Sequence, residues 1–433
     1  MLILLIYSHF CVSQFSKNKF IKRNSSIIKN KKIINDPVYG FISIPGGLIY
    51  ELIEHPYFQR LRRINQLGLT HYVYPGAVHS RFHHAIGAMH LMQQAIDVLR
   101  SKSFEISDAE YEAASIGILL HDIGHGPYSH TLERCLVPGA NHEFLSSCFM
   151  ERLNKKFDGA LDLAISVFNG KNEKKYLHQL ISGQLDVDRL DYLKRDSFFT
   201  GVSEGVIAYD RIIKMLNVHN NQLVVEAKGV YSVEKFLLAR RLMYWQVYLH
   251  KTVVCAEQIL VKILERAKYL SRNGTELDAT PALKYFLKNE LSRADFEKNE
   301  EALERFAALD DFDIFSAVKV WAYSTDKILS FLCKSLINRE LFKIELQSED
   351  FKTAYIVEKK AKIAAQLDID NPSDLDYFVF KGQLSNQEYN PETGNINVLF
   401  KDGSLKDFAS ATDYLDLSLK KKQVVKYFCC YPR

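Results

Sequence analysis

The sequence lacks the cysteine spacing of a disulfide framework or a zinc-binding module. Its seven cysteines are odd in number and scattered, and no two of them form a Cys-x-x-Cys pair. Disulfide-rich secreted domains and structural zinc sites both depend on regular spacing. We therefore expect a cytoplasmic protein, whose thiols stay reduced.

An apolar run long enough to cross a membrane is also missing. The N-terminal stretch MLILLIYSHFCVSQF imitates a signal peptide, but it has no basic residue before its apolar core and no A-x-A-like cleavage site. It is too short to span a bilayer, and the segment after it, SKNKFIKRNSSIIKNKK, is polar and basic. We expect residues 1–32 to form a disordered extension or to be the product of a start codon called too far upstream, and we expect no membrane partner.

Beyond that extension the chain has no excess of positive charge. The formal net charge is +4, but Met1–Lys32 carries seven Lys or Arg and no acidic residue, so the remainder has 49 basic against 52 acidic residues. A protein body that binds nucleic acid through its phosphates shows a clear basic excess. Nucleic acid is thus an unfavoured partner, although composition alone leaves it open.

Apolar residues recur at helical spacing over most of the chain. At 433 residues, with 47% apolar and 25% charged side chains, the chain is long enough for one large globular domain and a smaller one. Near Glu340 the pattern changes to expected strands in LFKIEL, DYFVF and INVLF, a helix in FKTAYIVEKKAKIAAQL and a turn at KDGS. We predict a mainly α fold, with a helical domain over residues 33–339 and a small α+β domain over 340–433.

Local signals mark where several helices begin. Ser107 precedes an apolar helical pattern and Glu110 follows three residues later, which is the spacing of a capping box. Pro56 interrupts the pattern of GGLIYELIEHPYFQRLRRINQLG, so a new helix starts there or the first one kinks.

The stretch HDIGHGPYSH, residues 121–130, places three histidines and an aspartate directly after the apolar run ASIGILL. Buried His and Asp side chains need charged or hydrogen-bonding partners, or a metal, to offset their desolvation. His84 and Asp188 are further candidate donors beside His121 and Asp122. Two imidazoles and two carboxylates leave coordination positions open, as in a catalytic centre. We predict a divalent ion there, with Mg, Mn, Fe, Co, Ni and Zn all open.

Six ordered blocks carry a family resemblance: NDPVYGFI, HPYFQRLRRINQLG, VYPGAVHSRFHHAIG, ILLHDIGHGPYSH, NHE and DVDRLDYLKRD. Together, from about Asn35 to Lys251, they resemble the HD phosphohydrolase superfamily. The similarity is greatest to the deoxynucleoside triphosphate (dNTP) triphosphohydrolases, which include dGTPases and the vertebrate enzyme that joins a sterile alpha motif to an HD domain. It implies hydrolysis of dNTPs, with dGTP as the possible preferred substrate, and a homo-oligomer, either a dimer or a tetramer.

The resemblance also implies roles for single residues. The metal ligands would be His84, His121, Asp122 and Asp188. Phosphate contact and proton transfer would fall to His125, His130 and His142. The substrate would be bound by Gln66, Leu67, Arg81, Arg189, Tyr192, Asp196, Arg240 and Tyr248. Independently of the family, the spacing of Asp188, Tyr192 and Asp196 at every fourth residue predicts that they share one face of a helix.

A regulatory site is a further implication. In the vertebrate relative a guanine nucleotide binds before the catalytic blocks and promotes an active tetramer, and Glu54, Gln59 and Arg62 occupy the matching positions here. The same stretch, FQRLR, is equally consistent with a surface helix carrying charge pairs. Activation by a nucleotide is therefore an open expectation.

Two other functions compete with the leading one. Another HD activity, such as a nucleoside monophosphatase or a phosphodiesterase, would use the same metal ligands, although the DYLKRD block favours the triphosphohydrolases. A non-catalytic nucleotide sensor or nucleic-acid-binding oligomer could also share the fold. Against that reading, every predicted ligand position holds a competent donor.

Overall fold

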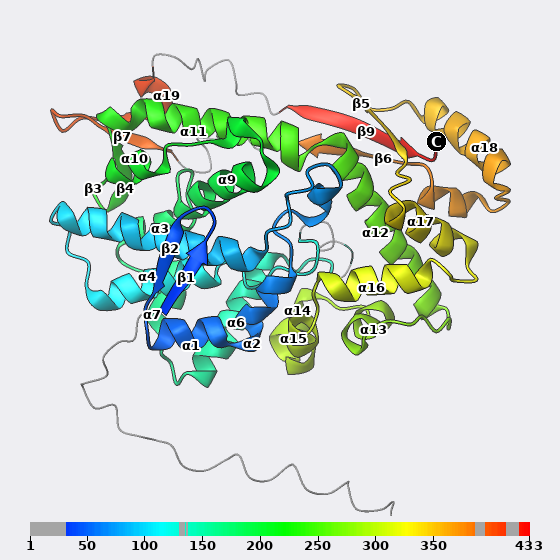
Figure 1. Cartoon of the computed structure of the whole chain (residues 1–433), viewed down its shortest axis with the longest axis horizontal. Coiled ribbons are helices and arrows are strands. Elements are labelled where there is room, and N and C mark those ends of the chain that lie inside the picture. The colour runs from blue at the N-terminus through cyan, green and yellow to red at the C-terminus, as the bar shows by residue number, and fades with distance from the viewer. Residues whose placement is uncertain (1–31, 130–134, 136, 386–394, 413–423) are drawn as a thin grey trace, which may run out of the picture.

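The computed structural model describes residues 32–129, 135, 137–385, 395–412 and 424–433. Helices dominate it, and the strands form only small sheets (Figure 1). The predicted mainly α class with a small α+β C-terminal region is confirmed. The predicted N-terminal extension, apart from Lys32, lies outside the described residues.

The helices of the first three quarters of the chain surround the candidate site. They are α1 (Leu48–Glu54), α2 (Pro56–Gln59), α3 (Arg81–Ser101), α4 (Asp108–Leu120), α6 (His142–Lys156), α7 (Asp162–Phe168), α8 (Lys175–Ile181), α9 (Val187–Thr200), α10 (Tyr209–Lys214), α11 (Val230–Met243) and α12 (Lys251–Arg272). Those that follow are α13 (Pro281–Lys288), α14 (Arg293–Lys298), α15 (Glu300–Ala307), α16 (Asp311–Trp321), α17 (Lys327–Ile337), α18 (Thr353–Leu367) and α19 (Phe408–Ala411).

The start signals in the sequence act as expected. Pro56 is the first residue of α2, where its missing N–H costs no hydrogen bond. Ser107 and Glu110 form the predicted capping box at the start of α4, with each side chain bonded to the other's backbone N–H. Every residue of α4 from Ala113 to Leu120 is buried, so this helix runs through the core and carries His121 and Asp122 to the site.

The strands form three small sheets. The first pairs β1 (Lys32–Asp36) with β2 (Gly40–Ile44) as an antiparallel hairpin. A second has the order β3-β4-β7-β8, and a third the order β5-β9-β6. Their strands are β3 (Leu216–His219), β4 (Gln222–Glu226), β5 (Lys343–Gln347), β6 (Phe380–Ser385), β7 (Asn397–Leu399), β8 (Leu405–Asp407) and β9 (Val425–Tyr431).

Two findings differ from the expected strands. The hairpin of β3 and β4 lies inside the region expected to be helical; Asn220 and Asn221, both in left-handed backbone conformation (φ 48° and 62°), form its turn. The strand expected in DYFVF begins only at Phe380, because a 3-10 helix over Pro372–Tyr377 takes up its first residues.

The C-terminal region is joined to the helical region through a shared sheet. Strand β7 pairs in parallel with β4, and β8 extends the same sheet beyond β7. The KDGS turn expected between them is present, with Gly403 at φ 81°.

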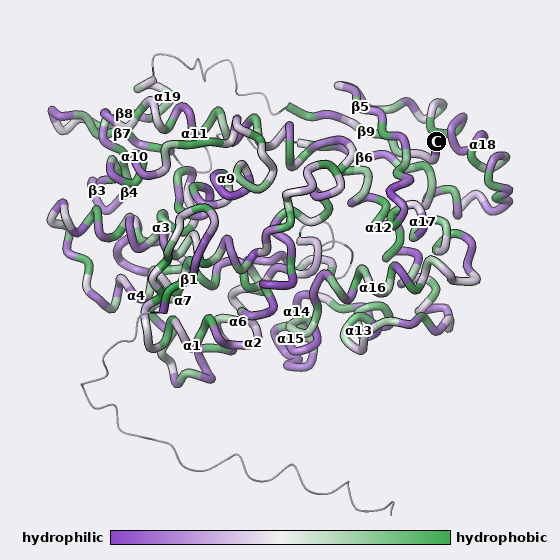
Figure 2. Tube along the Cα trace, in the orientation of Figure 1, coloured by the Kyte–Doolittle hydropathy of each residue, from purple (hydrophilic) through white to green (hydrophobic). Residues whose placement is uncertain are grey.

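Hydrophobic and hydrophilic segments alternate along most helices, as expected for amphipathic helices on a common core (Figure 2). None of the helices described is both long and apolar enough to cross a bilayer.

Candidate metal centre and active site

The four predicted metal ligands meet where α3, the end of α4 and the start of α9 come together. The Nε2 atom of His84 lies 3.0 Å from Asp188 Oδ1, 3.4 Å from His121 Nε2 and 3.7 Å from Asp122 Oδ2. His121 Nε2 lies 3.5 Å from the same Asp188 oxygen. Three helices far apart in sequence thus direct two imidazoles and two carboxylates at one point.

These distances fit a shared divalent ion. Donor atoms that each lie about 2.1 Å from one ion are about 3.0 to 3.4 Å apart in octahedral or tetrahedral geometry. His84, His121 and Asp122 offer donor atoms that all lie within 4.8 Å of one another. Mixed imidazole and carboxylate ligation accepts several metals, so the donor set supports a divalent ion without selecting one.

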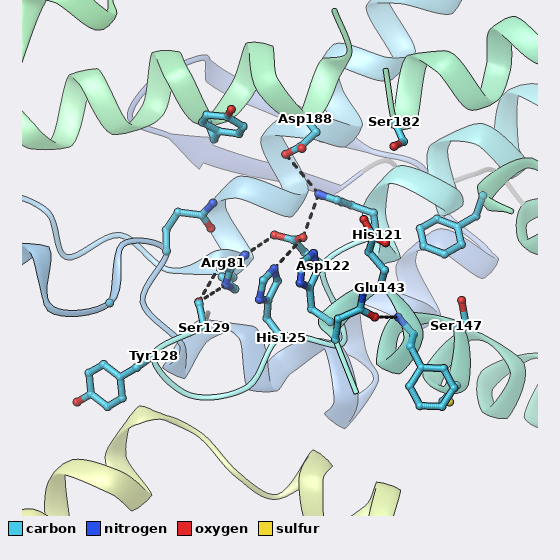
Figure 3. A pocket seen from close by; sticks show the side chains of 18 of the residues that line it. Arg81, His121, Asp122, His125, Tyr128, Ser129, Glu143, Ser147, Ser182 and Asp188 are labelled. Atoms are coloured by element: carbon cyan, nitrogen blue, oxygen red, sulfur yellow. Dashed lines mark hydrogen bonds and ion pairs between the residues drawn. The ribbon is translucent and has the colours of Figure 1, made fainter. Parts of the chain in front are cut away.

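A second cluster shares Asp122 with the first. His125 Nε2 lies 3.3 Å from Asp122 Oδ1, and the ring of His142 stacks on that of His125 with centroids 4.0 Å apart. Arg81 pairs with the other oxygen of Asp122 and donates to Ser129 Oγ from Nε at 2.9 Å. Figure 3 shows the Asp122 carboxylate between Arg81, His121 and His125.

The electrostatics of the site keep Asp122 ionised and His125 neutral. Burial would raise the pKa of Asp122, but the charges of His121 and Arg81, together with a hydrogen bond from His125, hold it well below its usual range. Burial lowers the pKa of His125, and the Arg81 charge lowers it further, so this imidazole is neutral at pH 7.

His84 behaves in the opposite way. Burial opposes its charged form, yet the hydrogen bonds that its ring donates to the Asp188 and Asp191 carboxylates outweigh burial and raise its pKa to about 10. A positive charge is therefore stabilised between the carboxylates, at the place where a metal cation would sit.

A buried ion network behind His84 was not predicted from the sequence. Asp191 Oδ2 accepts from His84 Nδ1 at 2.8 Å and from Arg195 Nε at 2.9 Å, while Arg195 Nη1 donates to Asp36 Oδ2 at 2.7 Å. The bond to Nδ1 turns Nε2 of His84 toward the ligand cluster. Gly87 makes room for this network, because a Cβ there would lie 2.1 Å from Asp191 Oδ1.

The opposite end of the site is a second polar network. Asp196 Oδ1 lies 2.8 Å from His79 Nε2, and Asp196 Oδ2 accepts from the Tyr248 hydroxyl at 2.8 Å. His79 stacks on Phe199 with ring centroids 4.4 Å apart. His79 is therefore the partner that orients Asp196. Tyr192 lies between the two ends, with its ring 6.2 Å from that of Tyr248.

One cavity of about 2000 Å³ connects the two ends. It exceeds the roughly 300 to 1000 Å³ of most small-ligand pockets, so a nucleoside triphosphate fits. The predicted residues on its lining are Gln66, Leu67, Arg81, His121, Asp122, His125, His142, Asp188, Arg189, Tyr192, Asp196 and Tyr248.

Three predicted residues, His84, Arg240 and Arg189, do more than line the cavity or lie away from it. His84 is fully buried behind the lining and contacts it through Asp188. Arg240 does not line the cavity; it is buried in α11, and its Nη1 lies 3.4 Å from Gln184 Oε1. His130 lies outside the described residues. Arg189, although on the lining, directs its guanidinium at Asp186 and the Gly183 carbonyl.

The predicted activator residues lie near the surface. Glu54 and Arg62 are exposed, and Arg62 Nε donates to Gln59 Oε1 at 2.8 Å. Gln59 Nε2 donates to the Ile53 carbonyl at 2.8 Å, and the Arg62 guanidinium lies 3.5 Å from the centroid of the Phe82 ring. Their nucleotide-binding role stays a prediction.

Comparison with known families identifies two adjoining regions. The HD domain model matches residues 81–196, which carry all four candidate ligands, and a model of an HD associated region matches residues 207–285.

Solved and curated relatives extend the likeness to the whole chain. A crystal structure of a phosphohydrolase from Bacteroides thetaiotaomicron is 52% identical, covers 93% of this chain and 100% of that one, and has a TM-score of 0.90. The uncharacterized protein YwfO of Bacillus subtilis is 33% identical, over 94% of this chain and 93% of its own length.

A third relative carries a named activity. The deoxynucleoside triphosphate triphosphohydrolase SAMHD1 of Homo sapiens is 26% identical, over 84% of this chain and 64% of its own length. The ligand cluster, the HD domain match and the full-length relatives agree. The chain therefore belongs to the HD-domain phosphohydrolase superfamily, and it is similar in sequence to SAMHD1.

Proposed function

We propose that the protein is a metal-dependent dNTP triphosphohydrolase that releases a deoxynucleoside and inorganic triphosphate. One observation carries the proposal: Asp188, Tyr192 and Asp196 follow each other at every fourth residue of α9 and all line the cavity. Asp188 is one of the candidate ligands, and Asp196 belongs to the second polar network. The wall therefore offers a phosphate site, an aromatic surface and a hydroxyl acceptor in the order in which a nucleotide presents its parts.

The metal end would supply the phosphate chemistry. His84, His121, Asp122 and Asp188 would hold the divalent ion, which when bound polarises a phosphate oxygen and lowers the pKa of a water molecule. Arg81 places a fixed positive charge beside Asp122, where it can neutralise charge on the phosphates.

The proposed reaction exchanges one phosphorus–oxygen bond for another. The water oxygen bonds to the α-phosphorus, the bond from that phosphorus to the 5′-oxygen breaks, and the 5′-oxygen takes up a proton. His125, buried and neutral, is suited to accept a proton from water. His130 and His142 are the other predicted proton carriers, and His142 is within stacking contact of His125.

The sugar end has acceptors suited to a nucleoside. Both Asp196 oxygens are fixed by His79 and Tyr248, and each can accept one further bond, as from a 3′-hydroxyl. Gln66 lines the cavity, and its buried Oε1 has no hydrogen-bond partner among the described residues. A donor on the substrate would satisfy it.

Product analysis tests the proposal. The purified protein is incubated with each dNTP alone and with all four mixed, in Mg²⁺ or Mn²⁺. Asp122→Ala removes a ligand, and Asp97→Ala, an exposed aspartate on α3, is the matched control. We expect deoxynucleoside and triphosphate from the wild type and the control, and neither from Asp122→Ala.

Other outcomes separate the alternatives. Release of phosphate or pyrophosphate would assign another HD phosphohydrolase activity, and no turnover under any condition would favour a nucleotide sensor. Relative rates with the four dNTPs measure the proposed dGTP preference. Activity only in mixtures, together with a larger mass by light scattering, would support activation and oligomerisation through Glu54, Gln59 and Arg62.

A further inference from the structure

Residues at the start of α16 form hydrogen bonds and an ion pair with two segments that border the cavity. The Leu309 carbonyl accepts from Arg60 Nη1 at 3.2 Å, and Asp310 pairs with Arg63. The next residue, Asp311, forms hydrogen bonds with both segments. Three consecutive residues at the start of α16, Leu309, Asp310 and Asp311, therefore bond the segment before α3. Asp311 also bonds the loop after α4.

Asp311 bonds two backbone amides with its two oxygens. Oδ2 accepts from the Asn65 N–H at 2.8 Å, and Oδ1 accepts from the Tyr128 N–H at 2.8 Å. The side chain is buried, and within the described ranges no basic side chain forms an ion pair with it. Burial raises its pKa to about 7, because ionising this carboxyl away from water costs free energy.

The loop that Asp311 holds is strained. Tyr128 and Ser129 both have φ 51°, in the left-handed region that side chains with a Cβ rarely adopt. Such conformations persist where surrounding contacts fix them, and they occur often at functional sites. The bond from Tyr128 N–H to Asp311 is one such contact.

The strained turn in turn orients Arg81. Ser129 Oγ accepts from Arg81 Nε at 2.9 Å and from Nη2 at 2.6 Å, so two donors of the guanidinium are aligned by one hydroxyl. The remaining amine, Nη1, pairs with Asp122 at the metal end. A displacement of the turn would therefore re-aim Arg81.

Asp311 fixes the other wall of the cavity by the same carboxylate. Asn65 immediately precedes Gln66 and Leu67, which line the cavity. The two oxygens thus set the relative position of the loop that carries Ser129 and the segment that carries Gln66. Asp311 does not itself line the cavity, and it lies outside both family-model matches.

We propose that Asp311 is a positioning residue, which clamps these two segments and thereby aims Arg81 at the substrate phosphates. The inference rests on the proposed function, because it assigns Arg81 to phosphate. A clamp of this kind acts on the geometry of the bound substrate, where small displacements have large effects on rate.

The test compares Asp311→Asn with Asp310→Asn. An Asn at 311 turns an amide donor toward one of the two N–H groups. An Asn at 310 remains a good N-cap for α16, loses only the ion pair with the exposed Arg63, and leaves both bonds of Asp311 in place. Hydrogen exchange reports the amides of Asn65 and Tyr128, and steady-state kinetics with a dNTP and Mn²⁺ report kcat and KM. We expect Asp311→Asn to expose the amide that loses its acceptor and to lower kcat/KM by about 10- to 100-fold, with Mn²⁺ binding unchanged.

Ser129→Ala gives an independent test that leaves Asp311 in place. It removes the acceptor that aligns Arg81, so we expect a loss of kcat/KM similar to that of Asp311→Asn and little further loss in the double variant. Additive losses, or wild-type kcat/KM in Asp311→Asn, would overturn the proposal.

Failure of the clamp and failure of the function are distinguishable. If the wild type hydrolyses no dNTP, the proposed function is wrong, and hydrogen exchange alone then decides the clamp. Loss of protection at Asn65 or Tyr128 would support it. Unchanged protection at both amides would overturn it.

Discussion

His84 and Asp122 at the metal end of the cavity are buried, whereas Glu54 and Arg62 in the predicted activator segment are exposed. Burying charged groups costs free energy unless each one is paired, while exposed charges on a surface helix cost little. The buried cluster therefore needs the network of Asp191 and Arg195 behind it. This contrast indicates where substitutions should have large effects and where they should not.

The largest expected effect is a pH dependence of stability at Asp311, a buried carboxyl behind the same cavity. Its pKa is about 7 in the folded chain, against about 3.9 when unfolded. Between these values the folded state binds more protons, so the free energy of unfolding falls as pH rises from about 4 to 7, by on the order of 4 kcal/mol for this group.

Chemical denaturation of wild type and Asp311→Asn across this range isolates the effect. The variant should gain stability relative to wild type as pH rises. Glu54→Gln, in the exposed segment, is the control and should differ from wild type by no more than about 0.5 kcal/mol. A pH-independent difference for Asp311→Asn would show that burial does not shift this carboxyl.

Gly87→Ala tests how tightly the buried network is packed. In an ordinary helix interior this substitution stabilises by about 1 kcal/mol. Here the new Cβ would lie 2.1 Å from Asp191 Oδ1 and 2.2 Å from Arg195 Nη2. We therefore expect the opposite sign, a loss of about 2 kcal/mol in thermal or denaturant unfolding. A stabilised variant would contradict the packing described for His84.

Asp191→Asn tests whether the network serves metal binding. The change removes the carboxylate that orients His84 through Nδ1, and the loss of such a partner typically weakens metal binding by about 10- to 100-fold. Calorimetric titration with Mn²⁺ measures it, with the exposed Asp210→Asn as control. Equal affinities in both variants would assign Asp191 to stability alone.

The smallest effect on stability is expected at the predicted activator residues Glu54, Gln59 and Arg62. Arg62→Ala removes an exposed hydrogen bond to Gln59 and should change the free energy of unfolding by no more than about 0.5 kcal/mol. If a nucleotide activates the enzyme there, the same variant loses the stimulation by mixed dNTPs. A loss of more than 2 kcal/mol would remove the contrast between the two regions.

Much of the architecture was predictable because its signals are local. A few residues of sequence are enough to show the capping box at Ser107, the helix start at Pro56 and the change from helical to strand-like patterns near Glu340. The hairpin of β3 and β4 was missed although Asn220 and Asn221 gave a turn signal, because the surrounding helical pattern was extended across it.

The supporting residues of the site could not be predicted in this way. Asp191 and His84 are 107 residues apart, and Asp311 and Tyr128 are 183 apart, so neither pairing leaves a local pattern. The three aspartates of LDVDRLDY gave the only hint of Asp191. Motif residues are visible in a sequence, whereas their buried partners depend on which helices the fold brings together.

Hydrolysis of a dNTP in ¹⁸O-labelled water tests the central claim most directly. If water attacks the α-phosphorus at the centre formed by His84, His121, Asp122 and Asp188, the label appears in the released triphosphate and the deoxynucleoside carries none. Label in the deoxynucleoside, or in free phosphate, would show attack at another atom and would contradict the account.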